Sequence, residues 1–145
     1  MIVALDTDVL VGWAMAGTTH HHLLRRFVER HVQRDGQVGL VPQVLFEFLH
    51  VVTDPKRFAK PLAMKDATRL VRDLWHTAEV VPILPTPDVV PRVLQFLDEL
   101  KLGRTRLLDT ALAATLERAG VSRLATLNGR DFEVFPFLDI IDPAR

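Results

Sequence analysis

The chain has 145 residues, contains no cysteine, and carries 18 basic and 18 acidic residues. This length fits an ordinary hydrophobic core, so we expect a single domain over residues 1–145. Zero net charge predicts no global attraction to nucleic acid or to an anionic membrane, and the absence of cysteine excludes disulfides and thiolate metal sites. Neither a signal peptide nor a membrane span is recognisable, which predicts a cytoplasmic protein with no membrane partner.

Apolar periodicity predicts strands that alternate with helices along the chain. Alternation of this kind predicts an α/β fold whose sheet is largely parallel and covered by helices. In chain order, the expected elements are a strand over 2–5, helices over 9–16 and 18–31, a strand over 38–41, helices over 42–52 and 62–78, a strand over 80–84, helices over 88–100 and 107–119, and strands over 123–126 and 138–141.

The first candidate functional residue is Asp6, which directly follows the apolar run 2–5. A buried strand here delivers Asp6 to its C-terminal tip, and ligands of open α/β sheets bind at the strand tips. A carboxylate at that place can hold a divalent cation, attack a phosphoryl group, or cap the next helix. The rest of the chain must distinguish these three uses.

Glu47 and Asp109 are further carboxylates inside apolar helices. Glu47 lies within 44–52, where only a narrow polar stripe remains, and Asp109 lies within 107–114. An ionised side chain buried without a partner is costly, so each needs a cation, hydrogen bonds or a water-filled cleft. Two structural explanations stay open, namely an exposed strip for Glu47 and a helix N-cap for Asp109.

Asn128 and Asp131 follow the predicted strand over 123–126. Asn128-Gly129 is first a turn signal, because both residues tolerate positive φ. Both polar side chains nevertheless leave the tip of a parallel strand, at the end of the sheet where Asp6 emerges. Four separated segments therefore each offer an oxygen ligand to one crevice.

Carboxylates that converge repel one another, so such a cluster needs protons or a cation to neutralise it. All-oxygen coordination favours Mg²⁺ or Mn²⁺ over zinc. These ions orient a water, lower its pKa, and stabilise the entering and leaving oxygens of a phosphodiester displacement. The residues therefore indicate metal-assisted hydrolysis of a nucleic-acid backbone.

Several basic and aromatic residues have a functional and a structural interpretation. Lys56, Arg57 and Lys60 could lead an RNA backbone toward the acidic crevice, although ordinary surface charge is the default. Trp13 and Trp75 have helical apolar neighbours, so packing is expected rather than base stacking.

Taken together, these segments resemble the PIN-domain ribonucleases, and within them the VapC-like toxins of bacterial toxin–antitoxin pairs. The resemblance implies a three-layer α/β/α sandwich with a mainly parallel sheet and an endoribonuclease that uses Mg²⁺ or Mn²⁺ to cleave RNA. It also implies frequent homodimerisation and neutralisation by a cognate antitoxin. The matching segments, in the family's order and spacing, are 1–10, 42–48 with 51–55, 108–114 and 124–132.

The resemblance implies roles for individual residues. Asp6 and Asp109 match the family's principal metal-binding aspartates, and Glu47 matches the acidic residue on its third helix. Asn128 falls where many members have Asp or Asn, and Asp131 matches the Asp of a closing Asp-Phe pair. We therefore expect Asp6, Glu47, Asp109 and Asp131 to be catalytic, and all five residues to hold or position the metal.

Two other functions stay open at this stage. Asp6-Thr7-Asp8 fits the Asp-x-Asp signature of haloacid-dehalogenase-like phosphatases, but the later lysine and paired acidic motifs are missing. The other alternative is a non-catalytic PIN-like module that binds RNA or protein, which the retained acidic residues argue against. Asp8 stands where the family often has Asn or Ser, so it either strengthens cation binding or caps the helix.

Overall fold

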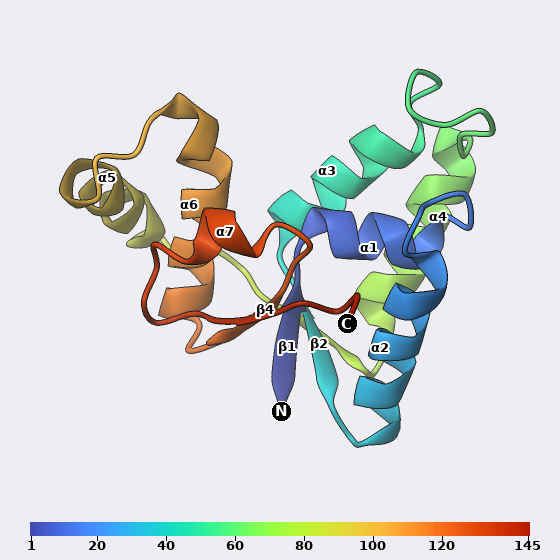
Figure 1. Ribbon diagram of the computed structural model, residues 1–145, viewed down its shortest axis with the longest axis horizontal. Helices are drawn as coiled ribbons and strands as arrows, with labels where there is room; N and C mark the ends of the chain where they lie inside the picture. Colours follow the sequence, from blue (N-terminus) through green and yellow to red (C-terminus); the bar gives the residue numbers. More distant parts are fainter.

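The computed structural model describes residues 1–145 as a sheet with helices on both faces (Figure 1). The strands are β1 (Ile2–Leu5), β2 (Gln37–Leu40), β3 (Val80–Pro82), β4 (Arg123–Ala125) and β5 (Asp139–Ile141). The helices are α1 (Thr7–Ala14), α2 (His21–Gln33), α3 (Pro42–Val52), α4 (Met64–His76), α5 (Val89–Glu99), the 3₁₀ helix η1 (Arg104–Arg106), α6 (Leu107–Arg118) and α7 (Gly129–Phe132).

All five strands are parallel, in the order β3-β2-β1-β4-β5. Helices α1 to α4 lie on one side of the sheet, and α5, α6 and α7 lie on the other (Figure 1). The chain first builds outward from β1 to β2 and β3, then returns to the opposite side of β1 for β4 and β5. The prediction of an α/β/α sandwich with a mainly parallel sheet is confirmed.

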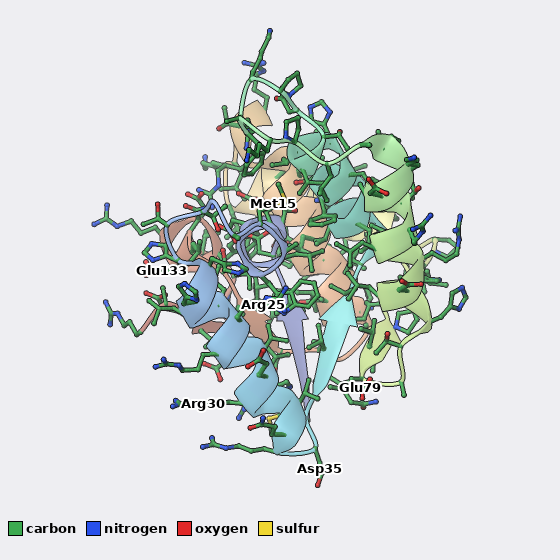
Figure 2. The ribbon with its side chains drawn as sticks, turned by 90° about the vertical axis from the view of Figure 1, so that its right-hand side faces the viewer. Met15, Arg25, Arg30, Asp35, Glu79 and Glu133 are labelled. Carbon is green, nitrogen blue, oxygen red and sulfur yellow. The ribbon has the colours of Figure 1, made fainter.

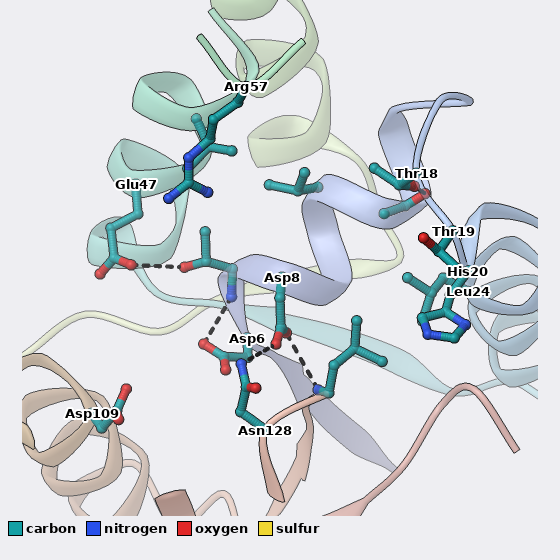
Figure 3. Close-up of a pocket in the computed structure, with 15 residues that line it drawn as sticks. Asp6, Asp8, Thr18, Thr19, His20, Leu24, Glu47, Arg57, Asp109 and Asn128 are labelled. Carbon is teal, nitrogen blue, oxygen red and sulfur yellow. Dashed lines mark hydrogen bonds between the residues drawn. The ribbon is translucent and has the colours of Figure 1, made fainter. Parts of the chain in front are cut away.

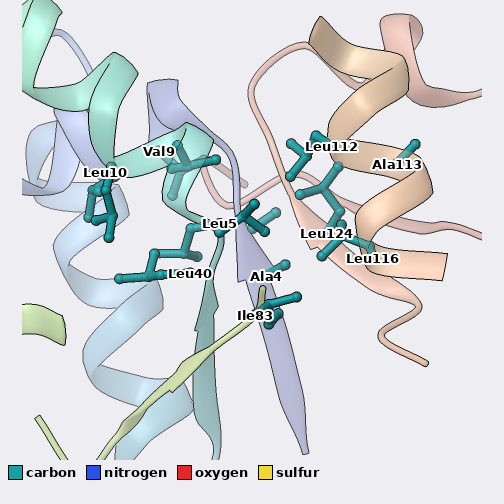
Figure 4. Close-up of a cluster of buried hydrophobic side chains, with 14 of the residues drawn as sticks. Ala4, Leu5, Val9, Leu10, Leu40, Ile83, Leu112, Ala113, Leu116 and Leu124 are labelled. Carbon is teal, nitrogen blue, oxygen red and sulfur yellow. The ribbon is translucent and has the colours of Figure 1, made fainter. Parts of the chain in front are cut away.

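Strand β1 forms the centre of the core because it is apolar toward both faces. Its residues Val3, Ala4 and Leu5 are all buried. Figure 4 shows Leu10 on one side of this strand and Leu116 of α6 on the other. Burial on both faces explains a continuous apolar run without alternation. It also fixes the position at which the next residue, Asp6, leaves the sheet.

Most element boundaries lie within a few residues of their predicted positions, and the differences have local causes. Helix α1 begins at Thr7 because the Asp6 side chain accepts a hydrogen bond from the Thr7 N–H as an N-cap. Helix α2 begins at His21 rather than at Thr18, because the Thr18 hydroxyl bonds the carbonyl of Met15 in the preceding turn. The turn expected at Asn128-Gly129 continues into the short helix α7.

The two tryptophans pack against the core, as predicted. The Arg25 guanidinium lies 4.8 Å from the centroid of the Trp13 ring, and its Nε donates to the Trp13 carbonyl at 3.0 Å. Figure 2 looks onto α2, with Arg25 beside α1 and Asp35 at the far end where the chain turns toward β2. None of the helices has the length and apolar character needed to cross a membrane.

Candidate metal centre

The predicted acidic crevice lies at the carboxyl edge of the sheet, between the ends of β1 and β4. These neighbouring strands are paired in register, Leu5 with Ala125, and the Asp6 N–H donates to the Ala125 carbonyl at 3.0 Å. The strand order reverses here, so the connections leave in opposite directions and open a crevice. A cavity of about 460 Å³ occupies this place.

Asp6 sits at the floor of this cavity as both a helix cap and a site residue. Its Oδ1 accepts from the Thr7 N–H at 2.8 Å, and its Oδ2 accepts from the Thr126 hydroxyl at 2.8 Å. Burial raises the pKa of Asp6, and the charges of Glu47 and Asp131 raise it further against these two hydrogen bonds. Asp6 therefore caps α1, which was one of the predicted alternatives, and it also lies where its ionised form is disfavoured.

Glu47 reaches the cavity from α3 and is held by two donors. The Thr7 hydroxyl donates to Oε2 at 3.1 Å, and Gln43 Nε2 donates to Oε1 at 3.0 Å. The same Gln43 nitrogen also donates to the Leu108 carbonyl at 3.0 Å, which ties α3 to α6. Hydrogen bonds of the half-buried Glu47 and of Gln43 thus connect α1, α3 and α6 beside the cavity, and Figure 3 shows Glu47 among the lining residues.

Asp109 enters the cavity from the first turn of α6, on the opposite side from Glu47 (Figure 3). It is not the N-cap of this helix, because Arg106 holds that position and no side chain caps it. Burial, followed by the charges of Asp6 and Asp131, raises the pKa of Asp109 to about 6. Arg106 opposes this effect, with its Nε 3.8 Å from Asp109 Oδ2.

Asn128 and Asp8 meet at the edge of the cavity. Asn128 Nδ2 donates to Asp8 Oδ2 at 2.7 Å, and the Leu127 N–H donates to Asp8 Oδ1 at 3.4 Å. Burial, with the charge of Asp6 as the next cause, raises the pKa of Asp8 to about 7. Asp8 therefore belongs to the crevice and bonds the loop after β4, which the sequence alone left open.

Asp131 is the one predicted site residue that does not line the cavity. It lies on α7, and its charge raises the pKa of both Asp6 and Asp109. The Asp131 backbone carbonyl accepts a hydrogen bond from Arg106 Nη2. Four predicted residues therefore line the cavity, namely Asp6, Glu47, Asp109 and Asn128. Asp131 lies outside it but close enough to raise the pKa of two of them.

Most candidate metal donors of the cavity are oxygens, with His20 as the one imidazole that lines it and no sulfur. Burial first, and then the charges of neighbouring carboxylates, raise the pKa of Asp6 and Asp109, so the ionised forms of both are disfavoured without a cation. As the side chains stand, no three acidic or histidine residues lie close enough together to form a ready-made ion site. The residue types fit Mg²⁺ or Mn²⁺, while the separation of the side chains requires them to converge on binding.

Several contacts beside the crevice could not be predicted from the sequence. Gln43 belongs to the polar stripe around Glu47, and Arg106 is a basic residue that could also lead RNA to the crevice, but their contacts to segments distant in the chain have no local signal. Thr126 is buried and bonds Asp6, and its place at the end of a predicted strand was the one available signal. Arg57, from the predicted basic loop, lines the cavity, whereas Lys56 and Lys60 do not.

The fold and the site together define a class of protein. It is a parallel α/β/α sandwich with an acidic crevice where the strand order reverses, and carboxylates from three separate segments line that crevice. The chain belongs to the PIN domain family, because the model of that family, described as "PIN domain", matches residues 3–138.

Similar proteins support the same assignment. The chain is 25% identical over 147 residues to Ribonuclease VapC24 of Mycobacterium tuberculosis (strain CDC 1551 / Oshkosh), covering 98% of this chain and 97% of that protein. The structure of M. tuberculosis VapC20, titled a Sarcin-Ricin loop cleaving toxin, has a TM-score of 0.65 at 16% identity and covers 86% of this chain and 87% of that one. A toxin–antitoxin complex from Klebsiella pneumoniae has a TM-score of 0.61 at 19% identity, with 97% of each chain covered. These structural likenesses establish the fold.

Proposed function

We propose that the protein is a divalent-metal-dependent endoribonuclease that hydrolyses RNA phosphodiester bonds as the toxin of a toxin–antitoxin pair. Membership of the PIN domain family and similarity to a protein named as a VapC ribonuclease support this function. The titles of the structural relatives, a cleaving toxin and a toxin–antitoxin complex, point in the same direction. In this proposal residues 1–145 form one PIN domain.

The observation that carries the proposal is that three carboxylates from separate elements line one cavity. Asp6 comes from the end of β1, Glu47 from α3, and Asp109 from α6. Their shared negative field is costly unless a cation neutralises it, and oxygen ligands of this kind suit Mg²⁺ or Mn²⁺. We assign these three residues to the ion, with Asn128 and Asp131 positioning the ion or its water.

The chain's own contacts prepare the acidic residues for this role. Hydrogen bonds from Thr7 and Thr126 fix both oxygens of Asp6, and Thr7 also holds Glu47. Asp109 must be ionised to bind a cation, and a pKa of about 6 leaves it mostly ionised at pH 8. When bound, the metal would activate a water and stabilise the charge that develops on the phosphate.

The two alternative functions receive less support. A phosphatase of the haloacid-dehalogenase type would need the later lysine and paired acidic motifs, which the sequence lacks. A non-catalytic module would have no need to keep three mutually repelling carboxylates in one cavity. The family and the named relative favour the ribonuclease over both.

Cleavage of RNA tests the proposal directly. Purified protein incubated with mixed structured RNAs should cut them with Mn²⁺ or Mg²⁺ and stop when the metal is chelated. Asp6→Asn and Asp109→Asn should each lower the rate roughly 10²–10³-fold, because each removes negative charge from the site that stabilises the transition state. The matched control is Asp98→Asn, an exposed carboxylate on α5 that should cut at the parental rate.

Circular dichroism must show that each variant stays folded. If Asp6→Asn or Asp109→Asn cuts as fast as the parent, the assignment of the metal site is wrong. Accumulation of a phosphoaspartate, or turnover of small phosphomonoesters, would instead support the phosphatase.

The remaining partners follow from the same proposal. We infer a homodimer, a cognate antitoxin protein as inhibitor, and action on RNA in the cytoplasm. The toxin–antitoxin complex among the structural relatives supports the antitoxin partner.

A further inference from the structure

A hydrogen-bonded pair, Asp8 and Asn128, joins the first turn of α1 to the loop that follows β4. The two residues lie 120 positions apart in the chain, and Asn128 Nδ2 donates to Asp8 Oδ2 at 2.7 Å. The Leu127 N–H donates to the other Asp8 oxygen at 3.4 Å. Both side chains line the cavity that also contains Asp6 (Figure 3).

This pair continues into the hydrogen bonds that hold Asp6. The Asn128 N–H donates to the Thr126 hydroxyl at 3.0 Å, and that hydroxyl donates to Asp6 Oδ2 at 2.8 Å. Asp8, Asn128, Thr126 and Asp6 are therefore linked in one chain of contacts. A displacement of the loop would therefore disturb the hydrogen bond from Thr126 to Asp6.

The direction of the hydrogen bond determines which end of the amide is free. Both oxygens of Asp8 accept hydrogen bonds, one of them from the NH₂ group of Asn128, and this contact leaves the carbonyl Oδ1 of Asn128 without a partner in the chain. An unrestrained amide can rotate and offer NH₂ to the cavity instead, and that group repels a cation. A serine at position 8 would not impose this choice, because a hydroxyl both donates and accepts.

We propose that Asp8 is a positioning residue that orients Asn128, so that the amide Oδ1 is available as a neutral oxygen donor to the divalent cation or to its waters. The inference rests on the proposed metal-dependent function and deepens it. It assigns Asp8 an action through Asn128, in place of direct coordination or simple helix capping. Partners of this kind commonly change metal affinity 10–100-fold when removed.

Calorimetric titration with Mn²⁺ alone, in the absence of RNA, tests this inference on the full chain. Asp8→Ala and Asn128→Ala should each weaken binding by roughly tenfold. The double variant Asp8→Ala/Asn128→Ala should lose less than the product of the two single effects, because the two residues act as a unit. Asp8→Asn keeps an acceptor oxygen of the same size, so it should lose less affinity than Asp8→Ala.

The possible outcomes separate the explanations. Multiplicative losses in the double variant would overturn the inference, since Asp8 would then act on the ion independently of Asn128. Unchanged Mn²⁺ affinity in Asp8→Ala, or equal losses in Asp8→Asn and Asp8→Ala, would also overturn it. Absence of Mn²⁺ binding in the parent protein would contradict the proposed function itself. If Asp8→Ala does not fold, the isosteric double variant Asp8→Asn/Asn128→Ala replaces it, and multiplicative losses in that variant would overturn the inference.

Discussion

Thr126 is the residue that connects the sheet to the acidic crevice. Its side chain is 1% exposed, and its hydroxyl donates to Asp6 Oδ2 while accepting from the Asn128 N–H. A hydroxyl can fill both roles at once because it is both donor and acceptor. The hydroxyl oxygen of Thr126 thus holds both the carboxylate of Asp6, which follows β1, and the loop that follows β4.

We predict that Thr126→Val, which preserves shape and removes the hydroxyl, lowers the free energy of unfolding by about 1–3 kcal/mol, because it removes the partner of the Asn128 N–H and of one oxygen of the partly buried Asp6 carboxylate. Urea denaturation measures this loss. The matched control is Thr115→Val on α6, whose hydroxyl bonds only the Ala111 carbonyl within its own helix. A Thr126→Val loss no larger than that of Thr115→Val would contradict this explanation.

The raised pKa of Asp109 leads to a prediction about pH in the metal-free protein. Its folded pKa of about 6 exceeds the ordinary 3.8, so the native state holds this proton longer than the unfolded chain. The stabilising contribution of the proton is present below pH 3.8 and is lost as the pH rises through 6. Asp109→Asn lacks this loss, so its stability relative to the parent should rise between about pH 4 and 7 and then stay constant, with a total gain on the order of 1 kcal/mol after allowance for solvent screening.

Unfolding of both proteins in chelator, at several pH values, checks this prediction. A stability difference between them that is independent of pH would show that the Asp109 carboxylate is not strained in the native state.

At the scale of helices and strands, local signals specify most boundaries. The run 2–5 and the segment from Pro42 to Val52 match their predicted bounds, because an apolar strand and a proline in the first helical turn are marked within the segment itself. The start of α2 and the short helix α7 differ, since they depend on hydrogen bonds such as that of Thr18 to the preceding turn. Propensity within a window does not encode such contacts.

The same distinction applies to the candidate site. Asp6, Glu47 and Asp109 could be selected from sequence because each is a carboxylate in an apolar segment, and all three line the cavity. The pairing of Asn128 with Asp8 and the contact of Gln43 with Leu108 could not be predicted. They join residues 120 and 65 positions apart and depend on side-chain geometry.

The connection between α2 and β2 provides a prediction at this scale. A Cβ on Gly36 would lie 2.5 Å from the His31 carbonyl oxygen and 2.4 Å from the His31 ring, while the Gly36 N–H donates to that same carbonyl. Gly36→Ala should therefore cost about 1–3 kcal/mol of stability through overpacking against backbone that cannot move freely. Thermal denaturation measures the cost, and Gly17→Ala is the control, because nothing lies within 4 Å of its added Cβ. Equal stability of the two variants would contradict this prediction.

For the whole molecule, the topology decides where the function lies. The strand order reverses between β1 and β4, and this places Asp6, Thr126 and the loop after β4 at one edge. Helices α3 and α6, from opposite layers of the sandwich, then bring Glu47 and Asp109 to the same cavity. A neutral protein thereby concentrates negative charge at one place.

Anomalous diffraction from crystals soaked in Mn²⁺ tests the central claim most directly. We predict an anomalous peak in the cavity, bound by oxygens of Asp6, Glu47 and Asp109, which turn toward one another to reach ligand distances of roughly 2.0–2.2 Å. The peak should be absent from crystals of Asp109→Asn. Well-ordered parental crystals without a peak in this cavity, or with manganese bound only elsewhere, would contradict the account.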